Sequence, residues 1–465
     1  MRIRLLTTLA AAALAFQASA GDLTPPGAPS ATMKTLDEVE PRIPIGPLTT
    51  PGDADSVHRI TQPGSYYLTG NVAVPAGKRG IEIASGDVSV DLAGFAIRAT
   101  QNGTLEGVAA IGGSLRNVSL TNGSINNVTG VGVHLGGAGG SVISDLRIFS
   151  SGDDGLRTGF AAVVERVVST WNGGDGIVTS NGTTLRDCFS EFNAVYGFVG
   201  RMTAQNCTAG ENGIAGFIGS GVFENCEARF NDGPGFYFNA PSVVTGASSL
   251  GNFGDGFTAI NEVSIAMHCL ASGNGGSGFA ANNGGAWTAT SCAAIENTQH
   301  GFWGGHRGRL VQCTAADNGA NGYFMGGGAV VDSHSRDNGD DGVRTFGSNP
   351  VTVRECTIES NGAHGIVIAG DADNSLVVGN TINGHATAGF GHGIRIEGTA
   401  NFVFIEGNYA RENIIGIQVN TSGNTVLDNR MTANSVAPLG FVAGNDVAPL
   451  SSAAAATNPK GNIFN

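Results

Sequence analysis

The chain has 465 residues, with 24 lysines and arginines against 38 aspartates and glutamates, so its formal net charge is −14. An acidic surface repels the phosphates of nucleic acids, which argues against DNA or RNA as a partner. Charged residues make up only 13% and hydrophobic residues 41% of the chain, and this excludes an intrinsically disordered protein.

Residues 1–20 have the pattern of a secretory signal peptide. Arg2 and Arg4 precede an apolar run from Leu5 to Phe16, and small residues follow up to Ala20, where we expect cleavage. The run is too short to span a bilayer, and no later stretch is longer, so we expect no membrane span. The sequence thus predicts a protein that is secreted, periplasmic or attached to the cell surface.

Residues 21–59 form an N-terminal segment that is rich in proline over its first 30 residues. Within it, Met33, Leu36 and Val39 recur at helical spacing. We expect a short helix here that caps the first coil of the structure that follows.

A glycine recurs through most of the remaining chain at intervals of 19 to 28 residues, and an internal period of this length is typical of a solenoid. These repeat glycines are Gly132, Gly155, Gly176, Gly197, Gly216, Gly235, Gly256, Gly278, Gly301, Gly322, Gly342, Gly365, Gly393 and Gly416. We expect them to supply the positive φ angle of a turn.

Two other residue types keep a fixed distance from these glycines. An asparagine stands four positions before ten successive ones, from Asn172 to Asn361. All seven cysteines stand nine positions before a repeat glycine, namely Cys188, Cys207, Cys226, Cys269, Cys292, Cys313 and Cys356. One shared phase and an odd number favour a buried row of reduced thiols over vertical disulfides.

Short alternating stretches and turn residues fill each unit, which at about 21 residues is too short for a pair of helices. Stacked units would place like residue on like residue, with the asparagines hydrogen-bonded from turn to turn and the large residue after each glycine inside. The sequence therefore predicts about 14 or more coils of parallel strands over residues 60–435. Residues 436–465 lose the repeat and are expected to form a C-terminal tail or cap.

The repeated pattern Asn-x-x-x-Gly-[Phe/Ile/Val] resembles the right-handed parallel β-helix repeat of the pectate-lyase-like superfamily, in its exported bacterial form. The resemblance implies an all-β fold, a single-stranded right-handed parallel β-helix with an N-terminal cap. It leaves the function open, because that fold is shared by lyases, hydrolases, epimerases, adhesins and phage tailspikes.

The position two residues after each repeat glycine is the most variable one, and we call it the outer row because alternation points it outward. From Gly197 to Gly393 it contains Val199, Ile218, Tyr237, Thr258, Ala280, Trp303, Phe324, Arg344, Val367 and Arg395. Aligned aromatic rings suit the faces of sugars, and arginine suits their carboxylates or sulfates. The predicted substrate-binding residues are Trp303, Phe324, Tyr237, Arg307 in the adjacent loop, and Asn321.

The residues directly before the repeat glycines, here called the pre-glycine row, include His300, Asn321, Asp341 and His364 on four consecutive coils. Together with Arg344 they offer acid, base and cation groups, so the candidate catalytic residues are Asp341, His300, His364 and Arg344. The alternative is that these are ordinary exposed positions on a long solenoid.

Two catalytic families share fragments with this chain. The doublet Asp340-Asp341, the tripeptide around His392, and Arg395-Ile396 resemble motifs of polygalacturonases, which use carboxylates across the scissile bond. Here Asp341 and His392 are expected two coils apart, and Glu397 stands where those enzymes carry a lysine.

The beginning of an alginate epimerase motif at Tyr196-Gly197-Phe198 continues without the Asp-Pro-His that does the chemistry. No cofactor is expected, although Asp371 and Asp373 offer oxygen ligands for calcium in the one 28-residue unit.

Two functions remain open from the sequence. The first is an exported protein that binds, and in one version cleaves, a polysaccharide on the outer face of its coils, as a lyase or a glycoside hydrolase. The second is a non-catalytic adhesion or scaffold protein of the cell envelope or surface. The outer row near Trp303 favours the first, and the absence of a complete catalytic motif favours the second.

Overall fold

The computed structural model describes residues 41–385 and 391–464, which consist of strands and turns without any helix. The predicted signal peptide and capping helix lie outside these residues. No helix that is long and apolar enough to cross a membrane occurs in the described part of the chain.

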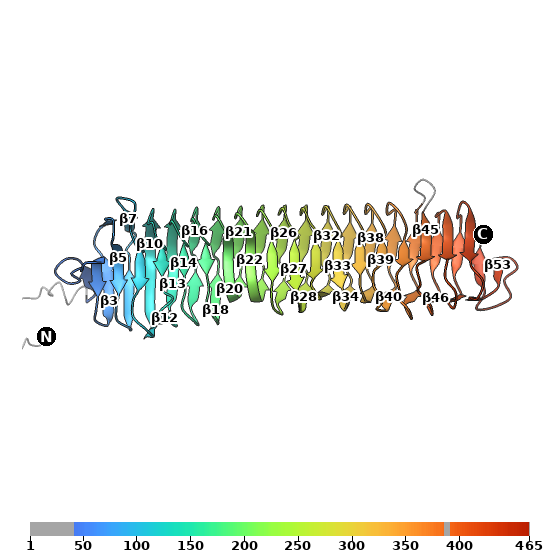
Figure 1. The fold of residues 1–465 in the computed structure, drawn as a ribbon, viewed down its shortest axis with the longest axis horizontal. Coiled ribbons are helices and arrows are strands. Elements are labelled where there is room, and N and C mark those ends of the chain that lie inside the picture. The colour runs from blue at the N-terminus through green and yellow to red at the C-terminus, as the bar shows by residue number, and fades with distance from the viewer. Residues whose placement is uncertain (1–40, 386–390, 465) are drawn as a thin grey trace, which may run out of the picture. The chain divides into compact units, whose positions relative to one another are not determined.

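The strands stack in about 18 turns and form three parallel faces (Figure 1). The strand after each repeat glycine builds the first face, from β2 (Ser56–Ile60) to β51 (Ala437–Phe441). The second face follows along the chain and runs from β1 (Ile43–Ile45) to β52 (Asp446–Val447). The third face ends at β54 (Asn462–Phe464). The predicted right-handed parallel β-helix is confirmed, and its faces extend beyond the predicted limits of 60 and 435.

Aromatic rings fill the interior behind the first face. Phe198, Phe217, Phe236, Phe257, Phe279 and Phe302 stack with ring centroids 4.7 to 4.8 Å apart, and Tyr323 continues the stack at 5.3 Å. This spacing equals the distance between neighbouring strands, so the period of the sequence directly creates the stack. All seven rings are buried, as predicted.

The asparagines form the predicted ladder at the turn after the third face. From Asn172 to Asn361, the Nδ2 of each donates to the Oδ1 of the next at 2.8 to 3.0 Å. His385 takes the next place, between Asn361 and Asn413, at 3.2 and 3.0 Å. Each buried amide therefore satisfies its hydrogen bonds through its neighbours in the stack.

The expected role of the repeat glycines was wrong. None of them has a positive φ; the left-handed residue lies directly before each ladder asparagine, for example Trp171, Phe192 and Asp317 at +55° to +58°. The glycines are needed instead because the turns approach closely. A Cβ on Gly301 would lie 2.7 Å from the carbonyl oxygen of Gly322 on the next turn.

The cysteines lie at the turn between the second and third faces, where all seven are buried and free. The row they form does not end at Cys356. Asn380 takes the next place and accepts the Cys356 amide at 2.9 Å, and Asn408, Asn429 and Asn462 continue the row. A second asparagine ladder thus replaces the thiols towards the C-terminus.

Candidate functional site

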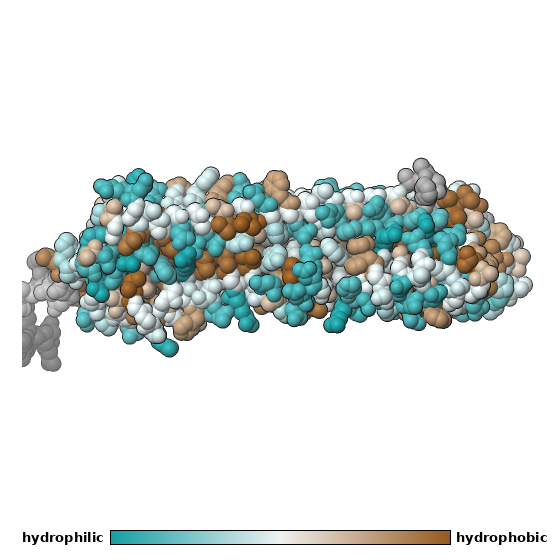
Figure 2. Space-filling model, in the orientation of Figure 1, coloured by the Kyte–Doolittle hydropathy of each residue, from teal (hydrophilic) through white to brown (hydrophobic). Residues whose placement is uncertain are grey.

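The outer row of the first face consists of two contrasting stretches. Strand pairing aligns Val178, Val199, Ile218 and Tyr237 on successive turns, and we call these the apolar stretch. Figure 2 shows hydrophobic side chains gathered over β20 (Tyr196–Gln205) and β22 (Ala215–Glu224), where this stretch lies.

Farther along the same face, Trp303, Phe324, Arg344, Val367 and Arg395 align in the same way, and we call these the charged stretch. Their strands are β33 (Phe302–Gly305), β36 (Tyr323–Met325), β39 (Val343–Thr345), β42 (Ile366–Ile368) and β45 (His392–Ile396). The predicted outer row is therefore continuous, although Thr258, Ala280 and Val367 within it are buried.

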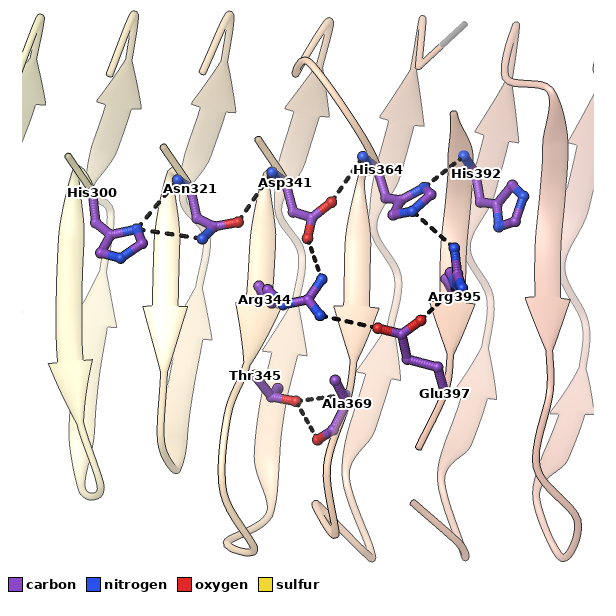
Figure 3. Close-up of polar contacts among 10 residues, drawn as sticks. All are labelled: His300, Asn321, Asp341, Arg344, Thr345, His364, Ala369, His392, Arg395 and Glu397. Carbon is purple, nitrogen blue, oxygen red and sulfur yellow. Dashed lines mark hydrogen bonds and ion pairs between the residues drawn. The ribbon is translucent and has the colours of Figure 1, made fainter. Parts of the chain in front are cut away.

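The pre-glycine row accepts backbone hydrogen bonds from turn to turn (Figure 3). The amide of Asn321 donates to His300 Nδ1 at 3.2 Å, and the amide of Asp341 donates to Asn321 Oδ1 at 3.1 Å. In the same way Asp341 Oδ1 accepts the His364 amide at 2.9 Å, and His364 Nδ1 accepts the His392 amide at 3.1 Å. These four side chains thus have a structural role as hydrogen-bond acceptors for the next turn, whether or not they act on a ligand.

These bonds fix the chemistry of the two histidines. A neutral imidazole carries one proton, and Nδ1 of His300 and of His364 accepts an amide, so the proton lies on Nε2. Burial lowers the pKa of His364 to about 4 and also lowers the pKa of His300, so both rings are neutral near pH 7. Each ring therefore presents an N–H donor at Nε2, where a general base would need a lone pair.

Asp341 is held from two sides. Its Oδ1 accepts the His364 amide, and its Oδ2 accepts Arg344 Nη1 at 2.8 Å. Burial raises the pKa of Asp341, and the bonds to Arg344 and to the amide act in the opposite direction. The carboxylate therefore serves the scaffold and orients the Arg344 guanidinium.

Glu397 joins the two arginines of the charged stretch. It binds Arg344 Nη2 at 3.0 Å and Arg395 Nε at 2.8 Å. Val367 lies between these arginines in the strand register and is fully buried. The three charged groups form a chain along the surface that crosses two turns (Figure 3).

A hollow of about 340 Å³ opens beside these groups. Its lining comprises His300, Asn321, Phe324, Asp340, Asp341, Arg344, Ala363 and His364. The structure therefore brings together all four candidate catalytic residues and two of the predicted binding residues.

Aromatic rings form one wall of the hollow. Phe324 stacks on His300 with centroids 4.5 Å apart and on Phe346 at 4.3 Å. Trp303 lies 6.3 Å from Phe324, and its buried Nε1 has no hydrogen-bond partner among the described residues. Phe324 is only half-buried, so the cluster offers a sugar a ring edge and part of a face.

The other predicted binding residues lie apart from the hollow. Arg307 is exposed in the turn between β33 and β34 (Gly308–Val311). Tyr237 belongs to the outer row but lies three turns before Trp303 and lines a different, mostly apolar depression with Ile218 and Pro234.

The residues that resemble polygalacturonase motifs do not come together in one site. His392 is two turns from Asp341, with His364 between them, so the polygalacturonase spacing is absent here. The sequence also has a second acidic doublet, Asp153-Asp154, and both of its carboxylates pair with Arg157.

The calcium candidates already have partners within the chain. Asp373 accepts the Asn401 amide at 2.7 Å, and Asp371 accepts the Thr399 hydroxyl. Over residues 41–385 and 391–464, no group of three or more His, Cys, Asp or Glu side chains could hold a metal ion.

Sequence reasoning missed two parts of the site. Glu397 was noted only as a departure from a motif, yet it links both arginines. Phe346, which directly follows β39, extends the aromatic wall from the position four residues after Gly342. The spacing Arg395-x-Glu397, in which Glu397 directly follows β45, was a usable signal for the first, since alternate residues of an extended chain share a face. The same spacing, Arg344-x-Phe346, was available for the second.

The solved structures similar to this chain are distant. The A-module of the mannuronan C-5 epimerase AlgE4 of Azotobacter vinelandii is 17% identical, with 83% of this chain and 91% of that one covered and a TM-score of 0.22. The periplasmic alginate epimerase AlgG is 11% identical over 86% and 84%, with a TM-score of 0.25. Tailspike protein 3 of bacteriophage CBA120 is 11% identical over 87% and 59%, with a TM-score of 0.27. None of these likenesses says what this chain binds.

No curated protein matches the chain. Residues 269–448, which include the hollow, match the family described as "Right handed beta helix region". In its fold the chain is a right-handed parallel β-helix protein, and over residues 269–448 its sequence is similar to the family of that description.

Proposed function

We propose that this protein binds a polysaccharide in the hollow between Phe324 and His364 and does not cleave it. The observation that carries the proposal is the composition of the hollow, with an aromatic wall of Phe324 and His300 beside N–H donors and the Asp340 carboxylate. Sugar rings need such a combination, because they present apolar faces and hydroxyl groups together.

The lack of a free base favours binding over cleavage. His300 and His364 hold their protons on Nε2, and both oxygens of Asp341 already accept hydrogen bonds. Hydrolysis and β-elimination both require a group that takes a proton from water or from the sugar. Asp340 is exposed, and a single exposed carboxylate does not make an acid–base pair.

We also propose that the protein is exported before it binds, on the basis of the signal-peptide pattern of residues 1–20. Polysaccharides of cell walls and capsules lie outside the cytoplasm, so location and ligand agree.

A panel of neutral, uronate-containing and sulfated polysaccharides tests the proposal by isothermal titration calorimetry. Phe324→Ala should weaken binding roughly five-fold, which corresponds to about 1 kcal/mol for one aromatic contact. Phe230→Ala is the matched control, because Phe230 is 55% exposed and lies outside the hollow. Absence of binding across the panel contradicts the proposal. Release of reducing ends or unsaturated uronates contradicts its non-catalytic part.

A further inference from the structure

His364 is the more buried of the two histidines that line the hollow. Its side chain is 7% exposed, and its Nδ1 accepts the His392 amide at 3.1 Å. The same acceptor role is filled by Asn321 and by Asp341 on the preceding turns. The position therefore does not require histidine for the scaffold.

The other ring nitrogen faces a donor. Nε2 of His364 lies 3.2 Å from Arg395 Nη1. Since Nδ1 accepts a proton from the backbone, Nε2 carries the hydrogen, and two N–H groups then meet without an acceptor between them. Moving the proton to Nδ1 only transfers the conflict to the His392 amide.

The guanidinium of Arg395 has few acceptors nearby. Glu397 is the only carboxylate that pairs with it in the described residues, and Glu397 is shared with Arg344. Two donors that converge beside a hollow, one of them charged, are the arrangement that binds an oxyanion. The lowered pKa of His364 agrees with a neutral ring held as a donor.

We propose that His364 Nε2 and Arg395 Nη1 form a paired donor for an anionic oxygen group of the ligand, a sugar carboxylate or sulfate. The inference deepens the proposed function, on which it rests, by naming a charged sugar as the residue bound at this end of the hollow. Each donor then meets one oxygen lone pair, and the conflict between the two N–H groups is resolved by the ligand.

Two substitutions separate the donor from the scaffold. His364→Asn keeps an amide acceptor, as in Asn321, and retains an N–H donor. His364→Asp keeps the acceptor, as in Asp341, but removes the donor and adds a negative charge. Both variants should unfold at the same denaturant concentration as the parent. With a uronate or a sulfated oligosaccharide, His364→Asn should bind within about three-fold of the parent, and His364→Asp should bind at least twenty-fold more weakly.

A second experiment compares the affinity of the parent protein for a uronate oligosaccharide and for the carboxyl methyl ester of the same oligosaccharide. Loss of affinity for the ester identifies a carboxylate, and preference for the sulfated oligosaccharide identifies a sulfate. Equal affinity for charged and uncharged oligosaccharides, or equal binding by the Asn and Asp variants, overturns the inference and leaves polysaccharide binding intact.

The tautomer gives a readout that does not depend on a glycan. Imidazole ¹⁵N chemical shifts should show His364 protonated at Nε2, and sodium sulfate should shift that signal in the parent and not in Arg395→Gln. A proton on Nδ1, or the same response in Arg395→Gln, overturns the paired donor. If no glycan binds while the sulfate response is present, the proposed function fails and the subsite stands.

Discussion

The apolar and charged stretches of the outer row occupy the same face of the same solenoid. Val199, Ile218 and Tyr237 in the first, and Trp303, Phe324 and Arg344 in the second, hold equivalent places in the strand register. The aromatic stack lies behind the apolar stretch and continues as far as Phe302 and Tyr323, and buried Val343, Ile366 and Ile394 continue the same inward row behind the rest of the charged stretch. The asparagine ladder follows the turn beside both stretches. The buried rows therefore define the fold, and the side chains of the outer and pre-glycine rows distinguish the surfaces.

The first and largest prediction concerns the glycines that both stretches share. Gly216→Ala and Gly301→Ala should each destabilise the protein by about 2–3 kcal/mol, because each Cβ would lie 2.7 Å from a carbonyl oxygen of the next turn. Equilibrium unfolding in denaturant measures both. Gly70→Ala is the control, since no atom lies within 4 Å of its Cβ position. A loss in only one stretch would mean that the scaffolds differ after all.

The repeat glycines also show which features of the fold could be predicted from the sequence and which could not. The period revealed the fold, the buried thiols and the asparagine ladder, because stacking repeats one environment in every turn. The period did not reveal the backbone conformation of the repeat glycines. A glycine selected for close approach and one selected for positive φ look alike in a sequence, and the left-handed place is filled here by residues such as Trp171 and Asp317.

The site was predictable only in part for a related reason. His300, Asn321, Asp341 and His364 could be aligned by counting from the glycines, and the structure brings them together. Their hydrogen bonds to the backbone of the next turn could not be foreseen, because these depend on side-chain direction at a turn. Glu397 and Phe346 each stand four positions after a repeat glycine, but the pre-glycine and outer rows comprise only the positions one before and two after the glycines.

The second prediction is that the two stretches respond to acid with opposite signs. Burial lowers the pKa of His364, His385 and His392 from 6.5 to about 4, so the unfolded chain binds these protons first. The stability they contribute is complete above pH 6.5 and is lost as the pH falls towards 4. Asp175, beside the apolar stretch, has its pKa raised by burial to about 6. Its protonation favours the folded state, so its contribution is gained as the pH falls below 6.

Hydrogen exchange at pH 7 and pH 4.5, corrected for intrinsic rates, should therefore show protection lost in β42 and β45 and retained in β17 (Ile177–Val178) and β20. His385→Asn is the sharpest variant, because His385 occupies an asparagine place in the ladder. The free energy of unfolding of this variant should fall by roughly 2–3 kcal/mol less than that of the parent between pH 7 and pH 4.5, and it should be nearly unchanged at pH 7. If this variant loses as much stability in acid as the parent does, the lowered pKa of His385 does not contribute to the acid sensitivity.

The third prediction is that the cysteines on the turns of the two stretches, which lie between the second and third faces, do not differ in reactivity. Neighbouring strands about 4.8 Å apart would place two thiols within the range of Cα separations that a disulfide spans. Cys207 and Cys313 are nevertheless free and buried, each donating to the carbonyl oxygen two residues earlier, at 3.3 Å. Thiol titration without reductant should find none of the seven reactive in the native protein and most of them in denaturant. Three disulfides and one thiol would contradict the reduced row, and reaction of Cys313 alone in the native protein would show that the charged stretch opens where the apolar one does not.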